Sequence, residues 1–123
     1  MQWAPVAGII EHITYRAGTF SLAYLPKSSV YNERNDIVIR CPDRSTVLVR
    51  QIAGTVARRI SCWVHESQPI TRCEKIGMIR FGSRVDIFLP RHVVVTAHLG
   101  DCVKGGNTVI GYVMPTDLQT SAI

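Results

Sequence analysis

The chain has 123 residues, of which 46% are hydrophobic and 19% charged, with a formal net charge of +5. This length allows one domain with a single core, and this composition excludes a disordered chain. No apolar run approaches the roughly 20 residues of a membrane-spanning helix, so we expect a soluble domain or a surface binder. The cations are spread along the chain, without the clusters and interleaved aromatics typical of nucleic-acid binding. We attribute the charge to solubility, with attraction to an anionic phospholipid surface as the alternative.

Short β-branched runs occupy the first half of the chain. The residues 6–13 alternate weakly in hydrophobicity after Pro5 and predict a strand, and the residues 20–25 predict a short second strand that ends at Pro26. Two further runs, 36–41 and 45–50, flank Pro42-Asp43-Arg44. High β propensity on either side of a tight turn predicts a hairpin.

The second half continues in the same way. The residues 51–63 are rich in Ile, Val and Ala, and Gly54 is expected to form a bend or bulge. Further apolar runs lie at 76–89, 93–97 and 107–114. No segment shows a sustained period of 3.6 residues, so we predict an all-β fold.

The four cysteines are too far apart for a zinc site, because none lies within four residues of another. We therefore expect no metal. Reduced, half-buried thiols are the simplest interpretation for a domain of this kind. The residues concerned are Cys41, Cys62, Cys73 and Cys102.

A faint internal repeat indicates how the strands are organised. The stretch 67–79 can be laid over 100–113 with one extra residue in the second copy, and 6–13 over 52–60. Gly-Asp-x-Val-x-x-Gly followed by an apolar strand resembles the half-units of lipoyl- and biotinyl-type barrel-sandwich hybrids. Repeated β units that share one core favour a compact sandwich, so we expect a single domain spanning 1–123.

Within the central run, a period of two gives one apolar face with a single polar exception, Ser83. A hydroxyl in a core-facing row needs a hydrogen-bond partner or serves chemistry. The residue before it, Gly82, is the least hindered acyl group that a neighbouring nucleophile could attack. The apolar members of this face are Ile79, Phe81, Val85, Ile87 and Leu89.

Four segments in this order resemble the short-form phosphatidylserine decarboxylase proenzymes. They are Ala-Pro-Val-Ala-Gly at 4–8, Asn-Glu-Arg-Asn at 32–35, Ile-Ala-Gly-Thr-Val-Ala-Arg-Arg-Ile at 52–60 and Phe-Gly-Ser-Arg-Val-Asp at 81–86. The resemblance covers nearly the whole chain, from about Ala4 to Val113. A Gly-Ser pair alone would have no value as a motif, whereas this combination is specific.

The resemblance implies a precursor that cuts itself between Gly82 and Ser83 into pieces 1–82 and 83–123. The Ser83 hydroxyl would attack the Gly82 carbonyl, and Ser83 would end as a pyruvoyl group, the covalent cofactor of the family. The implied enzyme is a lyase of phospholipid biosynthesis that converts phosphatidylserine to phosphatidylethanolamine. It implies a peripheral protein on the cytoplasmic side of the cell membrane, with the two pieces held together and a homodimer as a further expectation.

Two arginines are candidates for substrate binding. Arg34 could clamp a lipid phosphate, since arginine binds phosphate in a bidentate manner. Alternatively, the 32–35 segment is a polar connection whose Asn side chains cap a turn. Arg84 and Asp86 share a strand face and could simply pair, with a role for Arg84 in processing or substrate binding as the other interpretation.

The chain also departs from the family pattern. A histidine and an aspartate that serve processing lie upstream of the Ala-Pro-Val segment in the family and would fall before Met1. None of the chain's own histidines matches them: His12, His65, His92 and His98. Ser67 and Cys73 stand where the repeat unit usually carries glycine.

Activity of the chain alone is therefore an open prediction. The alternative is a truncated or inactive homologue that acts as a lipid- or protein-binding β module. A carrier domain is disfavoured, because no lysine lies in the Asp-Lys-Ala or Met-Lys-Met context that such domains present.

Overall fold

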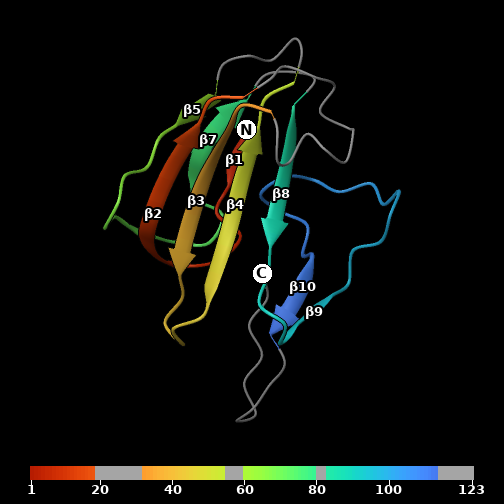
Figure 1. Ribbon diagram of the computed structural model, residues 1–123. Helices are drawn as coiled ribbons and strands as arrows, with labels where there is room; N and C mark the ends of the chain where they lie inside the picture. The colour runs from red at the N-terminus through yellow and green to blue at the C-terminus, as the bar shows by residue number, and fades with distance from the viewer. Residues whose placement is uncertain (19–31, 55–59, 80–82, 114–123) are drawn as a thin grey trace.

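A computed structural model describes residues 1–18, 32–54, 60–79 and 83–113, and these ranges form strands and turns (Figure 1). The all-β prediction is confirmed. Within the described ranges, no helix has the length and apolar character needed to cross a lipid bilayer. The strands are β1 (Gln2–Trp3), β2 (Gly8–Arg16), β3 (Arg34–Arg40), β4 (Thr46–Ile52), β5 (Ile60–Cys62), β6 (Pro69–Ile70), β7 (Lys75–Ile79), β8 (Arg84–Phe88), β9 (Val93–Val95) and β10 (Gly111–Val113).

The described strands form three sheets. The largest has the order β6-β2-β3-β4-β8, the second has the order β1-β7-β5, and β9 pairs with β10. Figure 1 shows the three-stranded sheet β1-β7-β5 (the small sheet) behind the five-stranded one (the large sheet), with β9 and β10 below β8. The pairs within these sheets are antiparallel.

The core lies between the two larger sheets. Alternate residues of β3 and β4, namely Ile37 and Ile39 with Val47 and Val49, are almost fully buried. Full burial of such side chains contributes about 1.5–3 kcal/mol each. The small sheet and the segments beside it add Ala4, Val6, Val64 and Ile76 to this cluster, and Ile10 of β2 and Ile70 of β6 join it from the large sheet.

The predicted hairpin is confirmed, and its turn has a local cause. Cys41 N–H donates to the Ser45 carbonyl at 2.8 Å, and Arg44 adopts a positive φ of 72°. One carboxylate oxygen of Asp43 accepts from both the amide (2.9 Å) and the hydroxyl (2.5 Å) of Ser45. These bonds lower the pKa of Asp43 below its ordinary value. The expected strand at 20–25 lies outside the described residues.

The repeat between 67–79 and 100–113 is confirmed by backbone conformation. Ser67 and Cys73 have positive φ angles of 70° and 68°. Their counterparts 33 residues later, Gly100 and Gly106, have positive φ angles of 85° and 73°. The non-glycine residues of the first copy therefore keep the left-handed conformation that glycine adopts more readily.

Hydrogen bonds repeat with the same spacing. Gln68 N–H donates to the His65 carbonyl at 3.2 Å, and Asp101 N–H donates to the His98 carbonyl at 3.1 Å. The pair Glu74 N–H to Thr71 carbonyl (3.2 Å) recurs as Asn107 N–H to Lys104 carbonyl (3.1 Å). We call residues 65–74 the first turn unit and residues 98–107 the second turn unit.

One prediction about the central run is wrong. The row from Ile79 to Leu89 does not form one strand, because β7 ends at Ile79 in the small sheet and β8 begins at Arg84 in the large one. Val85 and Ile87 were expected in the core, yet each is 37% exposed. The cause is that β8 forms the edge of its sheet, so only β4 packs beside it.

The cysteine prediction holds for half of the thiols. All four are free, and Cys41 and Cys62 are partly buried, but Cys73 and Cys102 are exposed. The exposed pair lies at the surface of the two turn units. Burial raises the pKa of the Cys41 thiol.

Candidate functional site

Ser83 lies where the chain crosses from β7 in the small sheet to β8 in the large sheet, and we call this crossover the passage. It is partly buried and directly precedes β8, whose first residue, Arg84, pairs with Ile52 at the end of β4. The preceding described residue is Ile79, the last of β7 in the other sheet. Gly82, the predicted acyl donor, lies outside the described residues. Ser83 is thus anchored on its carboxyl side by a strand with a defined register.

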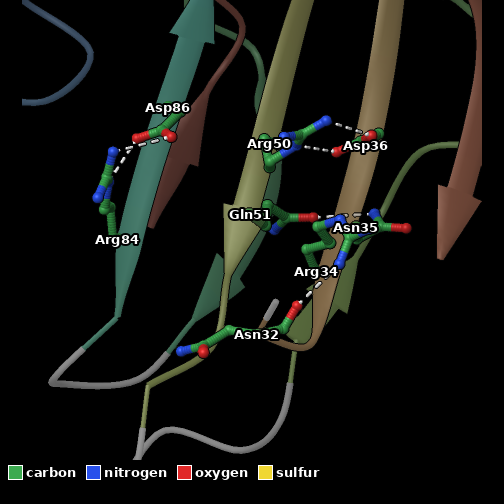
Figure 2. Close-up of polar contacts among 8 residues, drawn as sticks. All are labelled: Asn32, Arg34, Asn35, Asp36, Arg50, Gln51, Arg84 and Asp86. Carbon is green, nitrogen blue, oxygen red and sulfur yellow. Dashed lines mark hydrogen bonds and ion pairs between the residues drawn. The ribbon is translucent and has the colours of Figure 1, made fainter. Parts of the chain in front are cut away.

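A buried amide network lies next to this passage. Gln51 is fully buried, and its Nε2 donates to Gln2 Oε1 at 2.9 Å and to the Ser61 carbonyl at 3.1 Å. Its Oε1 accepts from Asn35 Nδ2 at 3.0 Å (Figure 2). Both amide protons of Gln51 are therefore committed, which fixes its orientation and joins β4 and β3 to β1 and β5.

Gln51 also constrains the strands on either side of the passage. In β8 its register partner is Val85. In β7, a Cβ added at Gly77 would lie 2.6 Å from Gln51 Nε2 and 2.4 Å from the Ser61 carbonyl oxygen, so only glycine fits there. Sequence reasoning missed Gln51. The available signal was its position two residues after Val49, which places a polar side chain in a core-facing row.

Asn32 and Arg34 hold the neighbouring end of β3. Asn32 is fully buried, and its Nδ2 donates to the Ala53 carbonyl at 2.9 Å. Arg34 Nη1 donates to the Asn32 carbonyl at 3.3 Å (Figure 2). These contacts give Asn32 a structural role at the end of β4, through a bond across the sheet and not through the expected capping of a local turn. Binding of a lipid phosphate by Arg34 stays a prediction.

The outer face of the large sheet carries two ion pairs (Figure 2). Arg50 contacts Asp36 through Nε at 2.7 Å and Nη2 at 3.0 Å, and this bond raises the pKa of Arg50. Arg84 contacts Asp86 at 2.6 and 3.1 Å. The predicted pairing of Arg84 with Asp86 is therefore confirmed. The Arg50 guanidinium also lies over the Phe88 ring, 5.1 Å from its centroid.

A carboxylate that sequence reasoning missed lies at the same end of the sheet. The Tyr15 hydroxyl donates to Glu33 Oε2, and this bond is the main cause of a raised Tyr15 pKa. Glu33 Oε1 is buried without a hydrogen-bond partner among the described residues. The Glu33 carbonyl accepts from Ala53 N–H at 2.9 Å, which extends the β3–β4 pairing by one residue at the end of the sheet where Ser83 precedes β8. Glu33 Oε1 can therefore accept one further hydrogen bond here.

The histidines lie in surface contacts, and two of them approach carboxylates. His92 Nε2 lies 3.6 Å from Asp43 at the hairpin turn, and His12 Nδ1 lies 3.8 Å from Glu66. Asp43 stands at the opposite end of β4 from Ser83. Across the described ranges, no group of three or more His, Cys, Asp or Glu side chains could hold a metal ion.

The fold and this passage define a class: an all-β domain with paired turn units and a serine between two sheets. The family model of phosphatidylserine decarboxylase matches residues 1–111. The chain belongs to the phosphatidylserine decarboxylase family.

Individual relatives agree with the family match. A phosphatidylserine decarboxylase proenzyme of Nitrobacter winogradskyi is 47% identical over 117 residues, covering 95% of this chain and 47% of the relative. The protein of the same description from Cereibacter sphaeroides is 44% identical over 118 residues, covering 96% and 51%. That from Granulibacter bethesdensis is 47% identical over 111 residues, covering 90% and 46%. No solved structure matches the chain. The chain spans about half the length of these relatives.

Proposed function

We propose that this chain is the serine-bearing part of a pyruvoyl-dependent phosphatidylserine decarboxylase that matures by cutting itself between Gly82 and Ser83. The observation that carries the proposal is the position of Ser83 in a chain of this family. It is the partly buried residue that directly precedes an anchored strand, at the passage from one sheet to the other. The pyruvoyl group would be made from Ser83 itself, so its fit requires no additional cavity.

The proposed maturation balances without an added oxidant. The Ser83 Oγ attacks the Gly82 carbonyl carbon, the Gly82–Ser83 C–N bond breaks, and the hydroxyl proton passes to the Ser83 nitrogen. Loss of the Ser83 Cα proton then expels the Gly82 carboxylate from Cβ and leaves a dehydroalanine. One water replaces the nitrogen, which leaves as ammonia. When present, the resulting ketone supplies an electron sink for loss of carbon dioxide.

The chain's own residues would assist by holding the passage in place. Gln51 constrains β7 through Gly77 and β8 through Val85, so the segment between these strands has fixed ends. Fixed ends favour attack, because a nucleophile held near its target avoids the entropy cost of finding it.

The proposed substrate is phosphatidylserine in an anionic membrane on the cytoplasmic side, with the protein bound peripherally. The net charge of +5 supports attraction to such a surface. Arg34 and Arg84 are the candidates for contact with the lipid headgroup. The product would be phosphatidylethanolamine.

Intact mass and a denaturing gel test the proposal, with the chain alone and with the part of the Nitrobacter winogradskyi relative outside the matched region supplied by co-expression. We expect two pieces, of which the smaller has no amino terminus and gains mass with borohydride. Ser83→Ala should remain uncut, while Ser45→Ala, a hydroxyl at the distant hairpin, should cut normally. An uncut wild-type chain under both conditions would contradict the proposal. A cut chain that releases no carbon dioxide from phosphatidylserine would overturn the substrate alone.

A further inference from the structure

The two turn units differ in how much of their apolar surface is covered. In the first unit Ile70 is 4% exposed, and after it Ile76 is fully buried. The counterpart of Ile70 is Val103, which is 57% exposed. The counterpart of Ile76 is Ile110, because Trp63 N–H donates to the Ile76 carbonyl as Thr96 N–H donates to the Ile110 carbonyl, and Ile110 is only half-buried. Val109, the residue before it, is 45% exposed. Since the backbone of the two units is alike, the difference lies in what packs against them.

An extended segment of the same chain covers the first unit. Ala4 N–H donates to the Glu74 carbonyl at 2.7 Å, and the Ala4 carbonyl accepts from Cys73 N–H at 2.8 Å. Ala4 is almost fully buried, and Val6, two residues on, joins Ile76 in the core cluster. The cover is therefore the segment Ala4-Pro5-Val6 between β1 and β2, whose small first residue makes both backbone bonds and whose β-branched last residue enters the core.

The second unit presents the same backbone groups without this cover. The counterparts of Cys73 N–H and the Glu74 carbonyl are Gly106 N–H and the Asn107 carbonyl. Neither has a backbone partner within the described part of the chain. The Trp3 ring bounds this site, because a Cβ at Gly106 would lie 3.0 Å from it.

We propose that Val103, Gly106, Asn107 and Val109 form a docking edge for a segment resembling Ala4-Pro5-Val6. The occupant is a segment from the half of the family's chain that this one does not span, with a small residue opposite Gly106 and a β-branched residue near Val103. Strand addition suits this edge, because backbone bonds supply affinity and the apolar side chains supply register.

A second copy of this chain is a poorer occupant. Its own Ala4–Val6 segment already pairs with its first turn unit, so it has no equivalent segment to offer. The relatives, by contrast, contain about as much chain again outside the matched region. The inference does not depend on cleavage at Ser83.

Hydrogen exchange on the full chain, co-expressed with the unmatched part of the Nitrobacter winogradskyi relative, tests the edge. We expect the Gly106 amide to exchange at least about tenfold more slowly in the complex. Val103→Asp and Val109→Asp should abolish both protection and association. Val95→Asp is the matched control, because Val95 is 56% exposed but lies in β9 outside the edge. All three positions are exposed, so the variants should keep the wild-type circular dichroism.

Four results would overturn the proposal. The Gly106 amide could stay unprotected in a complex that forms, or Val95→Asp could weaken association as much as Val103→Asp. Protection that appears only as the chain alone is concentrated would identify a second copy as the occupant. Protection by phosphatidylserine vesicles without the relative's segment would identify a lipid surface.

Discussion

The first and second turn units have the same backbone but opposite surroundings. Each reverses direction with two positive φ angles and two matching hydrogen bonds, yet one supports the core and the other is largely exposed. The packed unit keeps non-glycine residues at both left-handed positions, whereas the exposed unit has Gly100 and Gly106. Local hydrogen bonds are therefore sufficient to form the turn, and the first unit gains its packing from the Ala4–Val6 segment.

The largest expected contrast is between the equivalent apolar positions of the two units. Ile70→Ala should lower the free energy of unfolding by about 2–5 kcal/mol, because it leaves a cavity in an almost fully buried site. Val103→Ala should cost less than about 1 kcal/mol, because more than half of the residue is already exposed. Urea denaturation of both variants measures the difference. Equal losses would show that the second unit is packed in solution.

Substitutions at the left-handed positions of the two units should change the stability of the fold in opposite directions. Gly106→Ala should destabilise the chain by about 1–2 kcal/mol, since a Cβ is strained at φ 73° and meets the Trp3 ring. Cys73→Gly should stabilise it by about 0.5–1 kcal/mol, because relief of the strained φ exceeds the added entropy of glycine in the unfolded chain. Thermal unfolding under reducing conditions tests both. Destabilisation by Cys73→Gly would mean that the side chain makes a necessary contact.

The smallest contrast concerns the side chains that cap the two turns. The His98 amide donates to Asp101 Oδ2 at 2.8 Å, and the His65 amide donates to Gln68 Oε1 at 3.1 Å. We expect Asp101→Ala to cost about 0.5–1 kcal/mol and to speed exchange of the His98 amide, since a charged acceptor is lost. Gln68→Ala should have a smaller effect on His65, where strand pairing also holds the turn. Unchanged exchange at His98 would show that the backbone alone maintains the second unit.

The class of fold was predictable because its signals are local. β-branched runs around Pro42-Asp43-Arg44 specify the hairpin, and the repeated spacing specifies both turn units, even where Ser67 and Cys73 replace glycine. The pairing of Arg84 with Asp86 followed from their spacing along one strand face. Ser83 was identified from its neighbours in the family pattern, and its chemistry awaits the cleavage experiment.

The break between β7 and β8 was not predictable, because apolar alternation continues through it from Ile79 to Leu89. Alternation reports which face a residue occupies but not which sheet its strand joins. The exposure of Val85 has a similar origin, since edge position depends on the topology of distant strands. Gln51 was missed because its partners, Gln2 and Ser61, are far away in sequence and meet only in the folded chain.

The entry of β8 into the large sheet has a consequence for a chain severed before Ser83. The other strands of that sheet, β6, β2, β3 and β4, would all belong to the longer piece, and β8 would complete it from the shorter piece through five register pairs with β4. The two products would thus share one five-stranded sheet and be held together without a covalent bond. They should migrate together on a native gel and come apart only when denaturant dissolves the shared sheet.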